Sequence, residues 1–374
     1  MWRRFLHFGF IALATALGGC AHLRSANAPV PAPLATTDGG VPEDYVPPPA
    51  PDDLLKVTDP MREFVDRYVS RNAPGTQRLM DLANALLQPG LLGIQYDDVG
   101  TYTAEEMFRR RSGNCVSLSL LFVALAREVG LDARLQEVSV APQWDRQRDV
   151  LVKYRHINVT GDVGRSSTYM MDFKPDLAPV RVDAHSLTDA EAFAHFYNNR
   201  ASSYLLEGQL VAAHAWFMRA IELAPRSSFI WSNLALLYQR ASQAEDGERL
   251  LRYALRLDPA NVSAINNLAA LLATEGRTQE ADDLRVRAFK AQRRNPYYLL
   301  AMAERANAKG RPEEALSLLG RAIQLHSEET VFYESAARIA RSLNRLELAR
   351  GYEASADSLG GRAAEPSQRP RLEL

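Results

Sequence analysis

The sequence predicts two folded parts: an α+β domain in which a cysteine-bearing helix packs on an antiparallel sheet, followed by an all-α solenoid of helix pairs. Two observations lead to this fold class. Small residues and turn residues recur every 34 positions through the C-terminal half. Upstream, a long apolar helical segment precedes three segments rich in β-branched residues, as strands are. A length of 374 residues fits two domains of ordinary size.

The N-terminus has the pattern of an export signal. Arg3 and Arg4 precede an apolar stretch at residues 5–17, and Cys20 follows small residues directly after it. This ending resembles the lipobox of bacterial lipoproteins, so residues 1–19 are predicted as a lipoprotein signal peptide and Cys20 as the lipidation site. The stretch is shorter than the roughly 20 residues that a spanning helix needs. The alternative is an ordinary cleaved signal peptide with an accidental cysteine.

The segment after the signal indicates where the protein would be held. Residues 20–50 are rich in Pro and Ala and are expected to form a semi-extended tether. Ala21 stands where an aspartate tends to retain lipoproteins in the inner membrane, so the resemblance implies the periplasmic side of the outer membrane. Net charge is −1 without a basic stripe, which argues against nucleic acid as a partner. Membrane contact would therefore come from the lipid on Cys20.

Residues 51–190 are expected to form the α+β domain. Its predicted elements are helices at 59–71 and 103–110, a buried helix from Cys115 to about Gly130, and antiparallel strands at 133–140, 150–160 and 167–173. If residues 161–166 turn the chain, His156 and Asp172 fall on adjacent strands, and their separation of 16 allows direct pairing across a hairpin.

Cys115 is the thiol that is left once Cys20 is assigned to the anchor. A free cysteine in an oxidising compartment is either inert core or a nucleophile. The helix-start position favours a nucleophile, because the macrodipole and the unpaired backbone N–H groups stabilise thiolate over thiol. Thiol acyl transfer needs this thiolate, a histidine that shuttles its proton and a carboxylate that orients the imidazole. His156 and Asp172 are the candidates for those two roles.

Each candidate has an ordinary alternative. Cys115 alone would be a buried structural thiol, His156 a structural strand residue, and Asp172 a cap of the turn at residues 174–175. The oxyanion hole is expected from the backbone N–H of Cys115 and one side chain upstream, with the choice among Gln95, Tyr96 and Tyr102 left open. No cofactor is predicted, since no phosphate loop is visible and calcium spacing is not diagnostic at Asp97, Asp98 and Asp145.

The residues around the three candidates follow a characteristic order. They are Gly113-x-Cys115, a Gly-Leu-Asp-Ala-Arg segment at 130–134, His156, and a strand that ends in Asp172. This pattern resembles the transglutaminase-like superfamily, whose papain-like Cys-His-Asp triad maps onto the three candidates. The resemblance covers about residues 102–175 and implies thiol acyltransferase or amide hydrolase chemistry. One departure is Val116, where many members carry an aromatic residue.

The C-terminal half repeats with a period of 34 residues from about residue 194. Three series follow the period: Ala220, Ala254, Ala288, Ala322 and Ala356; Ala213, Gly247, Ala281, Ala315 and Ala349; and, at turn positions, Gly208, Ser242, Gly276, Gly310 and Asn344. With Trp231, Tyr238 and Pro259, the pattern resembles the tetratricopeptide repeat (TPR), a helix–turn–helix unit. About five units are expected over residues 194–358, followed by a disordered tail at 359–374.

Asn199, Asn233 and Asn267 also recur every 34 residues, on the first helix of three units. The first helices of TPR proteins line a concave groove, so the resemblance implies that these amides bind an extended peptide. The alternative is that they bond neighbouring helices, since polar groups on an inner face need partners. Both readings stay open from the sequence.

These features together predict a lipid-anchored periplasmic enzyme, an amide or peptide hydrolase or a transglutaminase-like acyltransferase with a Cys-His-Asp triad. Its repeats would bind a periplasmic or envelope protein or peptide as substrate or partner. The alternative is a non-catalytic TPR scaffold lipoprotein with a retired transglutaminase-like domain. The complete set of Cys115, His156 and Asp172 favours the enzyme.

Overall fold

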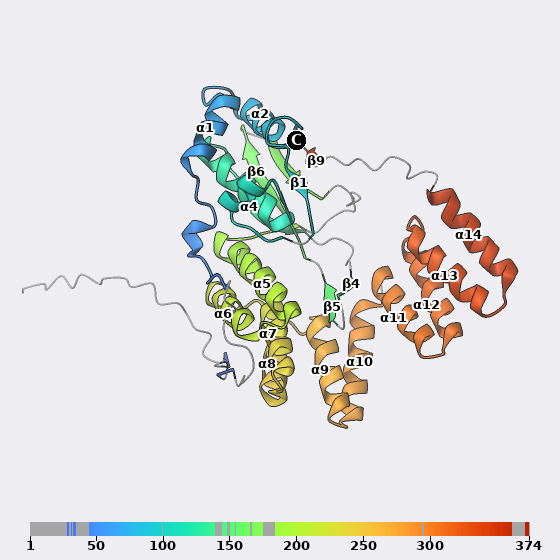
Figure 1. The fold of residues 1–374 in the computed structure, drawn as a ribbon. Coiled ribbons are helices and arrows are strands. Elements are labelled where there is room, and N and C mark those ends of the chain that lie inside the picture. The colour runs from blue at the N-terminus through green and yellow to red at the C-terminus, as the bar shows by residue number, and fades with distance from the viewer. Residues whose placement is uncertain are drawn as a thin grey trace, which may run out of the picture.

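The computed structural model describes residues 28–29, 31, 33–34, 45–98, 100–138, 144–147, 150–153, 155–164, 167–174, 184–293, 295–360 and 371–373. The predicted signal peptide and Cys20 lie outside these residues. An α+β domain occupies one end of the molecule, and a row of paired helices extends from it (Figure 1). The predicted fold class is confirmed.

The first half of the α+β domain is mainly helical. In chain order its elements are η1 (Pro51–Asp53), α1 (Asp59–Tyr68), α2 (Gly75–Leu87), β1 (Gln95–Tyr96), α3 (Ala104–Arg110), β2 (Ser112–Gly113) and α4 (Cys115–Glu128). A capping box of Thr103 and Glu106 begins α3, and Arg111 ends it in the left-handed conformation. Helix α1 ends three residues before the predicted limit, and α2 is an additional helix that the sequence reading missed.

A five-stranded sheet of the described residues supports α4. Its order is β8 (Ala184–Ser186), β3 (Arg134–Val138), β6 (His156–Val163), β7 (Ser167–Asp172) and β9 (Arg371–Glu373), with antiparallel neighbours. Phe122 of α4 packs against Tyr169 and Phe173, and Ser119 donates a hydrogen bond to the Ile157 carbonyl at 3.4 Å. The cysteine helix therefore covers this sheet, as predicted.

The strand predicted at residues 150–160 is wrong in its extent. The segment divides into β5 (Val150–Lys153), which pairs with β4 (Trp144–Gln147) in a separate hairpin, and β6, which continues through Gly161 to Val163. Gly161 is a strand residue because a Cβ there would lie 2.0 Å from the Asp132 carbonyl oxygen. The chain turns later, at Gly164, where φ is +73°.

Paired helices form the second part, and among the described residues there are five pairs. They are α5 (Asp189–Glu207) with α6 (Leu210–Leu223), α7 (Ser228–Arg240) with α8 (Ala244–Leu257), α9 (Val262–Thr274) with α10 (Thr278–Gln292), α11 (Pro296–Ala308) with α12 (Pro312–Leu325), and α13 (Thr330–Ser342) with α14 (Leu346–Gly360). The first helix begins five residues before the predicted start of the repeats.

The recurring residues have the physical roles that their spacing suggests. The turn series has positive φ at each position, from 83° at Gly208 to 58° at Asn344. Alanines of the other two series, such as Ala213 and Ala254, are fully buried where helices cross. At Gly247 a Cβ would meet the Ala235 carbonyl oxygen at 3.2 Å, so the helices approach closely.

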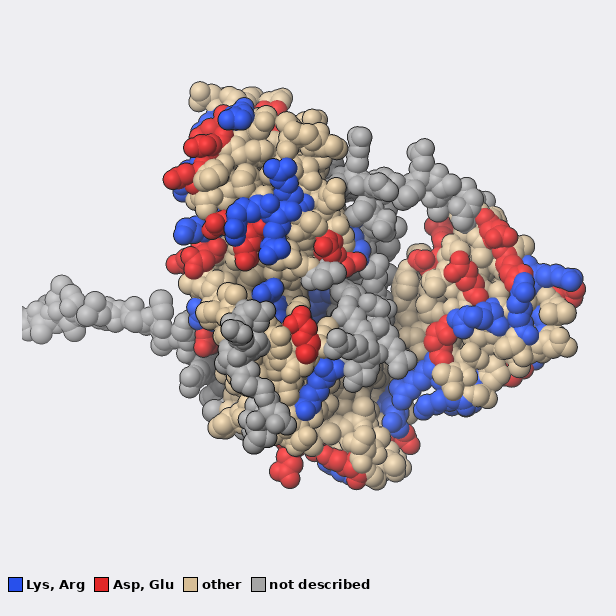
Figure 2. All heavy atoms as spheres, viewed as in Figure 1, with Lys and Arg blue, Asp and Glu red and all other residues tan. Residues whose placement is uncertain are grey.

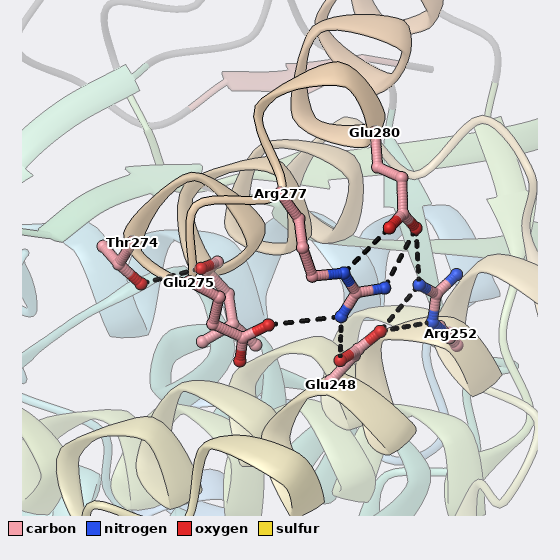
Figure 3. A network of polar contacts seen from close by, with 7 residues as sticks. Glu248, Arg252, Thr274, Glu275, Arg277 and Glu280 are labelled. Carbon is pink, nitrogen blue, oxygen red and sulfur yellow. Dashed lines mark hydrogen bonds and ion pairs between the residues drawn. The ribbon is translucent and has the colours of Figure 1, made fainter.

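A surface network of charges joins the second and third pairs (Figure 3). Arg277, at the start of α10, bonds Glu248 of α8 at 2.8 Å and Glu280 of its own helix at 2.8 and 3.0 Å. Arg252 of α8 also reaches Glu280, at 3.2 Å. Such a network fixes the angle between neighbouring repeats, whereas single exposed ion pairs contribute little. On the face shown in Figure 2, basic and acidic side chains are interspersed.

The two parts share one hydrophobic core. A single cluster of buried side chains extends from Leu54 in the α+β domain to Tyr298 in α11, and a second cluster fills the last two helix pairs. Arg127 of α4 adds a bidentate ion pair to Asp189 of α5, at 2.6 and 2.8 Å. The first repeats are therefore packed on the α+β domain without a flexible connection.

The two ends of the chain touch these folded parts where they are described. Tyr197 of α5 donates to the Pro49 carbonyl at 2.7 Å, and Gln243 donates to the Pro33 carbonyl at 3.1 Å. Pieces of the predicted tether thus lie against the repeats. Instead of disorder throughout 359–374, β9 pairs with β7 of the α+β domain (Figure 1). Within the described ranges, no helix is both long and apolar enough to cross a membrane.

Candidate active site

Cys115 is the first residue of α4, as its position before a buried apolar helix predicts. Asn114 caps this helix: its side chain accepts from the Ser117 backbone N–H at 3.1 Å and donates to Thr101 Oγ1 at 2.6 Å. The thiol is free and half-buried. The cap fixes the helix start, so the thiol stays at the positive end of the α4 dipole.

His156 and Asp172 lie side by side on β6 and β7. The imidazole Nε2 donates to both carboxylate oxygens, at 2.9 Å to Oδ1 and 2.7 Å to Oδ2. The register pairs Val159 with Met171, so one further step places Asn158 opposite Asp172 and His156 diagonal to it. The predicted neighbourhood is found, but the contact is diagonal and not directly across the hairpin.

Asp172 is held by two further donors. The backbone N–H of Lys174 reaches Oδ1 at 2.9 Å, and the Asn158 amide reaches Oδ2 at 3.0 Å. Burial raises the pKa of Asp172, but the hydrogen bond and charge of His156, with these two donors, lower it below the ordinary value. Asp172 therefore caps the turn and orients the imidazole at the same time, which the sequence reading treated as alternatives.

Cys115 also contacts the imidazole of His156. Burial lowers the pKa of His156, but hydrogen bonds from Asp172 and Cys115 and the charges of both raise it to about 9. Because Nε2 contacts Asp172, Nδ1 is the ring nitrogen that remains for the thiol. His156 is only 4 % exposed, so its charged form depends on these two partners. The arrangement can hold an imidazolium beside a thiolate.

Three side chains were candidates for an oxyanion partner. Strand β1 pairs with β2, which places Gln95 beside Ser112 and Tyr96 beside Gly113, just before the thiol. The Tyr96 ring lies 5.5 Å from the Lys174 ammonium, next to the Asp172 turn. Tyr96 is therefore the candidate with a contact to the Asp172 side of the site.

Tyr102 is bound on the other side of the cysteine helix. Its backbone N–H donates to Ser117 Oγ at 2.8 Å, and its ring lies 4.5 Å below the Arg110 guanidinium. Gln95 is exposed on β1. The geometry does not single out one of the three as an oxyanion donor.

The asparagines of the repeats have different surroundings. The Asn233 amide of α7 donates to Asn198 Oδ1 of α5 at 2.9 Å, so it bonds a neighbouring helix. Asn199 and Asn267 are half-buried on α5 and α9. The reading that these amides join helices therefore applies to Asn233, and peptide binding stays a prediction.

Asn158 is a site residue that the sequence reading did not single out. It is buried, donates to Asp172, and has no partner for its own buried Oδ1 among the described residues. Strand alternation carries the signal, since residues two apart on a strand share a face and Asn158 follows His156 by two. In the described part of the chain, no group of three or more His, Cys, Asp or Glu side chains could hold a metal ion.

Comparison with known families defines the class of this domain. Residues 62–199 match the sequence profile described as "Transglutaminase-like superfamily", a range that contains Cys115, His156 and Asp172. The chain thus carries a transglutaminase-like domain, followed by a TPR-type helical solenoid. The matched range ends inside α5, so it overlaps the first helix of the repeats.

Solved structures that resemble the chain are helical repeat proteins. The crystal structure of MamA is 15% identical with a TM-score of 0.32, and covers 44% of this chain and 96% of its own. PilF of Pseudomonas aeruginosa is 18% identical (TM-score 0.34; 46% and 78%). BtubC of P. vanneervenii is 14% identical (TM-score 0.36; 50% and 87%). A comparison with curated proteins finds no match.

Proposed function

We propose that the chain is a lipid-anchored thiol acyl-transfer enzyme in which Cys115, His156 and Asp172 form the catalytic triad. The observation that carries the proposal is the buried imidazole of His156, held by Asp172 at Nε2 and contacted by Cys115. A thiol at a helix start beside an oriented imidazolium is the arrangement of activated cysteine nucleophiles. The superfamily match of residues 62–199 supports the same class of chemistry.

The proposed reaction cleaves an amide by acyl transfer to Cys115. The thiolate attacks the carbonyl carbon, and the His156 imidazolium gives its proton to the departing amine, which leaves a thioester. Water or a second amine then attacks the thioester, His156 accepts its proton, and the thiolate is released. Asp172 keeps the imidazole oriented and stabilises its charged form. Hydrolysis is proposed over cross-linking, because water is the default acceptor unless a pocket excludes it.

The repeats are proposed to bind the substrate or a partner protein of the cell envelope. Stacked helix pairs present a long continuous surface, which suits an extended peptide or a folded partner. The lipid on Cys20 would hold the chain on the periplasmic side of the outer membrane. Metabolic labelling with an alkyne fatty acid tests the anchor: label on the parent and none on Cys20→Ser is expected.

Alkylation of Cys115 tests the triad without knowledge of the substrate. In Cys20→Ser protein Cys115 is the single cysteine, so iodoacetamide consumption reports on it alone. His156→Gln and Asp172→Asn should slow alkylation at neutral pH, because the thiolate loses its imidazolium or the imidazole its anchor. His185→Gln is the control, since His185 is exposed on β8 of the same sheet.

The same experiment separates the enzyme from the scaffold. If His156→Gln reacts as fast as His185→Gln, the imidazole does not activate the thiol and the triad proposal is wrong. The non-catalytic scaffold would then be the better reading. A thioester on Cys115, seen as added mass after exposure to envelope protein extracts and removed by hydroxylamine, would support the enzyme directly.

A further inference from the structure

Four side chains meet where the α+β domain contacts the repeats. Glu137 comes from β3, Arg155 stands directly before β6, His195 belongs to α5 and Phe229 to α7. We call this set the junction bridge. Its two repeat residues occupy equivalent positions, since His195 and Phe229 are separated by one 34-residue period. The bridge therefore joins the α+β domain to the first helices of two successive repeats.

Charge holds one side of the bridge together. Glu137 binds the Arg155 guanidinium through Oε1 and lies 3.3 Å from His195 Nε2 through Oε2. Burial raises the pKa of Glu137, but the hydrogen bond to His195 and the charge of Arg155 outweigh it and lower the pKa to about 2. One carboxylate thus ties together the loop before β6 and helix α5.

Stacking holds the other side. The Arg155 guanidinium lies 4.5 Å above the Phe229 ring, and the His195 ring stacks on the same phenyl group at 4.8 Å with an interplanar angle of 26°. A planar guanidinium can stack on a ring and bind a carboxylate at the same time, which an ammonium group cannot do as well. Phe229 of the second repeat is therefore in direct contact with Arg155.

The bridge borders the triad through the backbone of two strands. Arg155 is the residue before His156, and Glu137 precedes Val138, whose cross-strand partner is His156. A displacement of Arg155 or Glu137 would therefore move the backbone on one or both sides of His156. The bridge also lines a cavity of about 200 Å³ that includes Ser228, so it lies at a gap between the two parts.

We propose that the junction bridge makes the first two repeats part of the catalytic unit: Phe229 and His195 hold Arg155 and thereby position His156 against Cys115. Arg155, Glu137, His195 and Phe229 act as positioning residues and touch no substrate in this role. The inference rests on the proposed triad. It predicts that a change in the second repeat alters the reactivity of a thiol in the other domain.

The test uses the full chain with Cys20→Ser and follows iodoacetamide alkylation of Cys115 across pH. Phe229→Leu removes the ring under Arg155 and keeps an apolar side chain, and Arg155→Lys keeps the charge but loses the planar group. Phe289→Leu is the matched control, because Phe289 lies 5.4 Å below the Arg321 guanidinium in the later repeats. The thermal midpoint of each variant is measured in parallel.

We expect Phe229→Leu and Arg155→Lys to slow alkylation at neutral pH on the order of tenfold and to change its pH profile, because a misplacement near 1 Å suffices. Phe289→Leu should react like the parent even where its thermal midpoint falls equally. If Phe229→Leu and Phe289→Leu alkylate alike while His156→Gln is slow, the bridge is wrong and the triad stands. If His156→Gln is not slow, both proposals are wrong.

Discussion

The charged state of His156 offers a direct check on the site geometry. The pKa of His156 is raised from its ordinary 6.5 to about 9, although burial alone would lower it. Asp172 is the largest favourable cause, followed by Cys115. Replacing Asp172 by Asn removes that charge and keeps the size of the side chain. The pKa of His156 should then fall markedly in Asp172→Asn and less in Cys115→Ser.

The magnitude follows from linkage between protonation and folding. A rise of the pKa from 6.5 to about 9 corresponds to about 3 kcal/mol of stability. Because the folded-state pKa is the higher one, this contribution is fully present below pH 6.5 and is lost as the pH rises through about 9. The parent should therefore lose stability across this window, and Asp172→Asn should lose less.

Two measurements test this expectation. Carbon–proton correlation spectra of the histidine rings give the titration of His156, whose resonance is identified by its loss in His156→Gln. Urea unfolding across the same window gives the stability, and the difference between parent and Asp172→Asn cancels other titrating groups. A His156 midpoint near 6.5 in the parent, or equal slopes in both proteins, would refute the reasoning.

Three further predictions concern stability. Asn158→Ala should destabilise the protein by about 1–3 kcal/mol in urea unfolding, because a buried oxygen of Asp172 loses its donor. Ala254→Phe should cost about 1–3 kcal/mol by overpacking a helix crossing, whereas Val286→Phe at an exposed site should cost little. Phe332→Ala should cost about 3–5 kcal/mol and speed hydrogen exchange in α11 to α14, since Phe332 belongs to the second core cluster. Exchange that rises equally in α4 would contradict this division.

The solenoid was predictable because its signal is repeated. Glycine at positions 208, 276 and 310 suggests a left-handed turn, and the period extends that requirement to Ser242 and Asn344, which adopt positive φ as well. Small residues at helix crossings likewise repeat with the fold. Each unit therefore tests the same local rule, and errors at one position are corrected by the others.

The candidate site was predictable only in part. Strand composition and a separation of 16 residues place His156 and Asp172 on neighbouring strands, but Gly161 suggested a turn that comes later, so the pair is diagonal. Gly161 is required by the close Asp132 carbonyl, a contact between distant segments. The contact between Arg155 and Phe229 joins residues 74 positions apart, and no local pattern announces such a contact.

The shared core decides how the two parts can be separated. A cut near residue 190 would divide the salt bridge of Arg127 with Asp189, expose Phe196 of α5 and end the chain inside the range that matches the superfamily. Loss of activity after such a cut would follow from damage to the domain itself. The boundary between the two core clusters lies instead in α11, near Tyr298. Substrate selection by the later repeats is therefore best tested by surface substitutions on α11 to α14, which leave the junction bridge and the site around Cys115 intact.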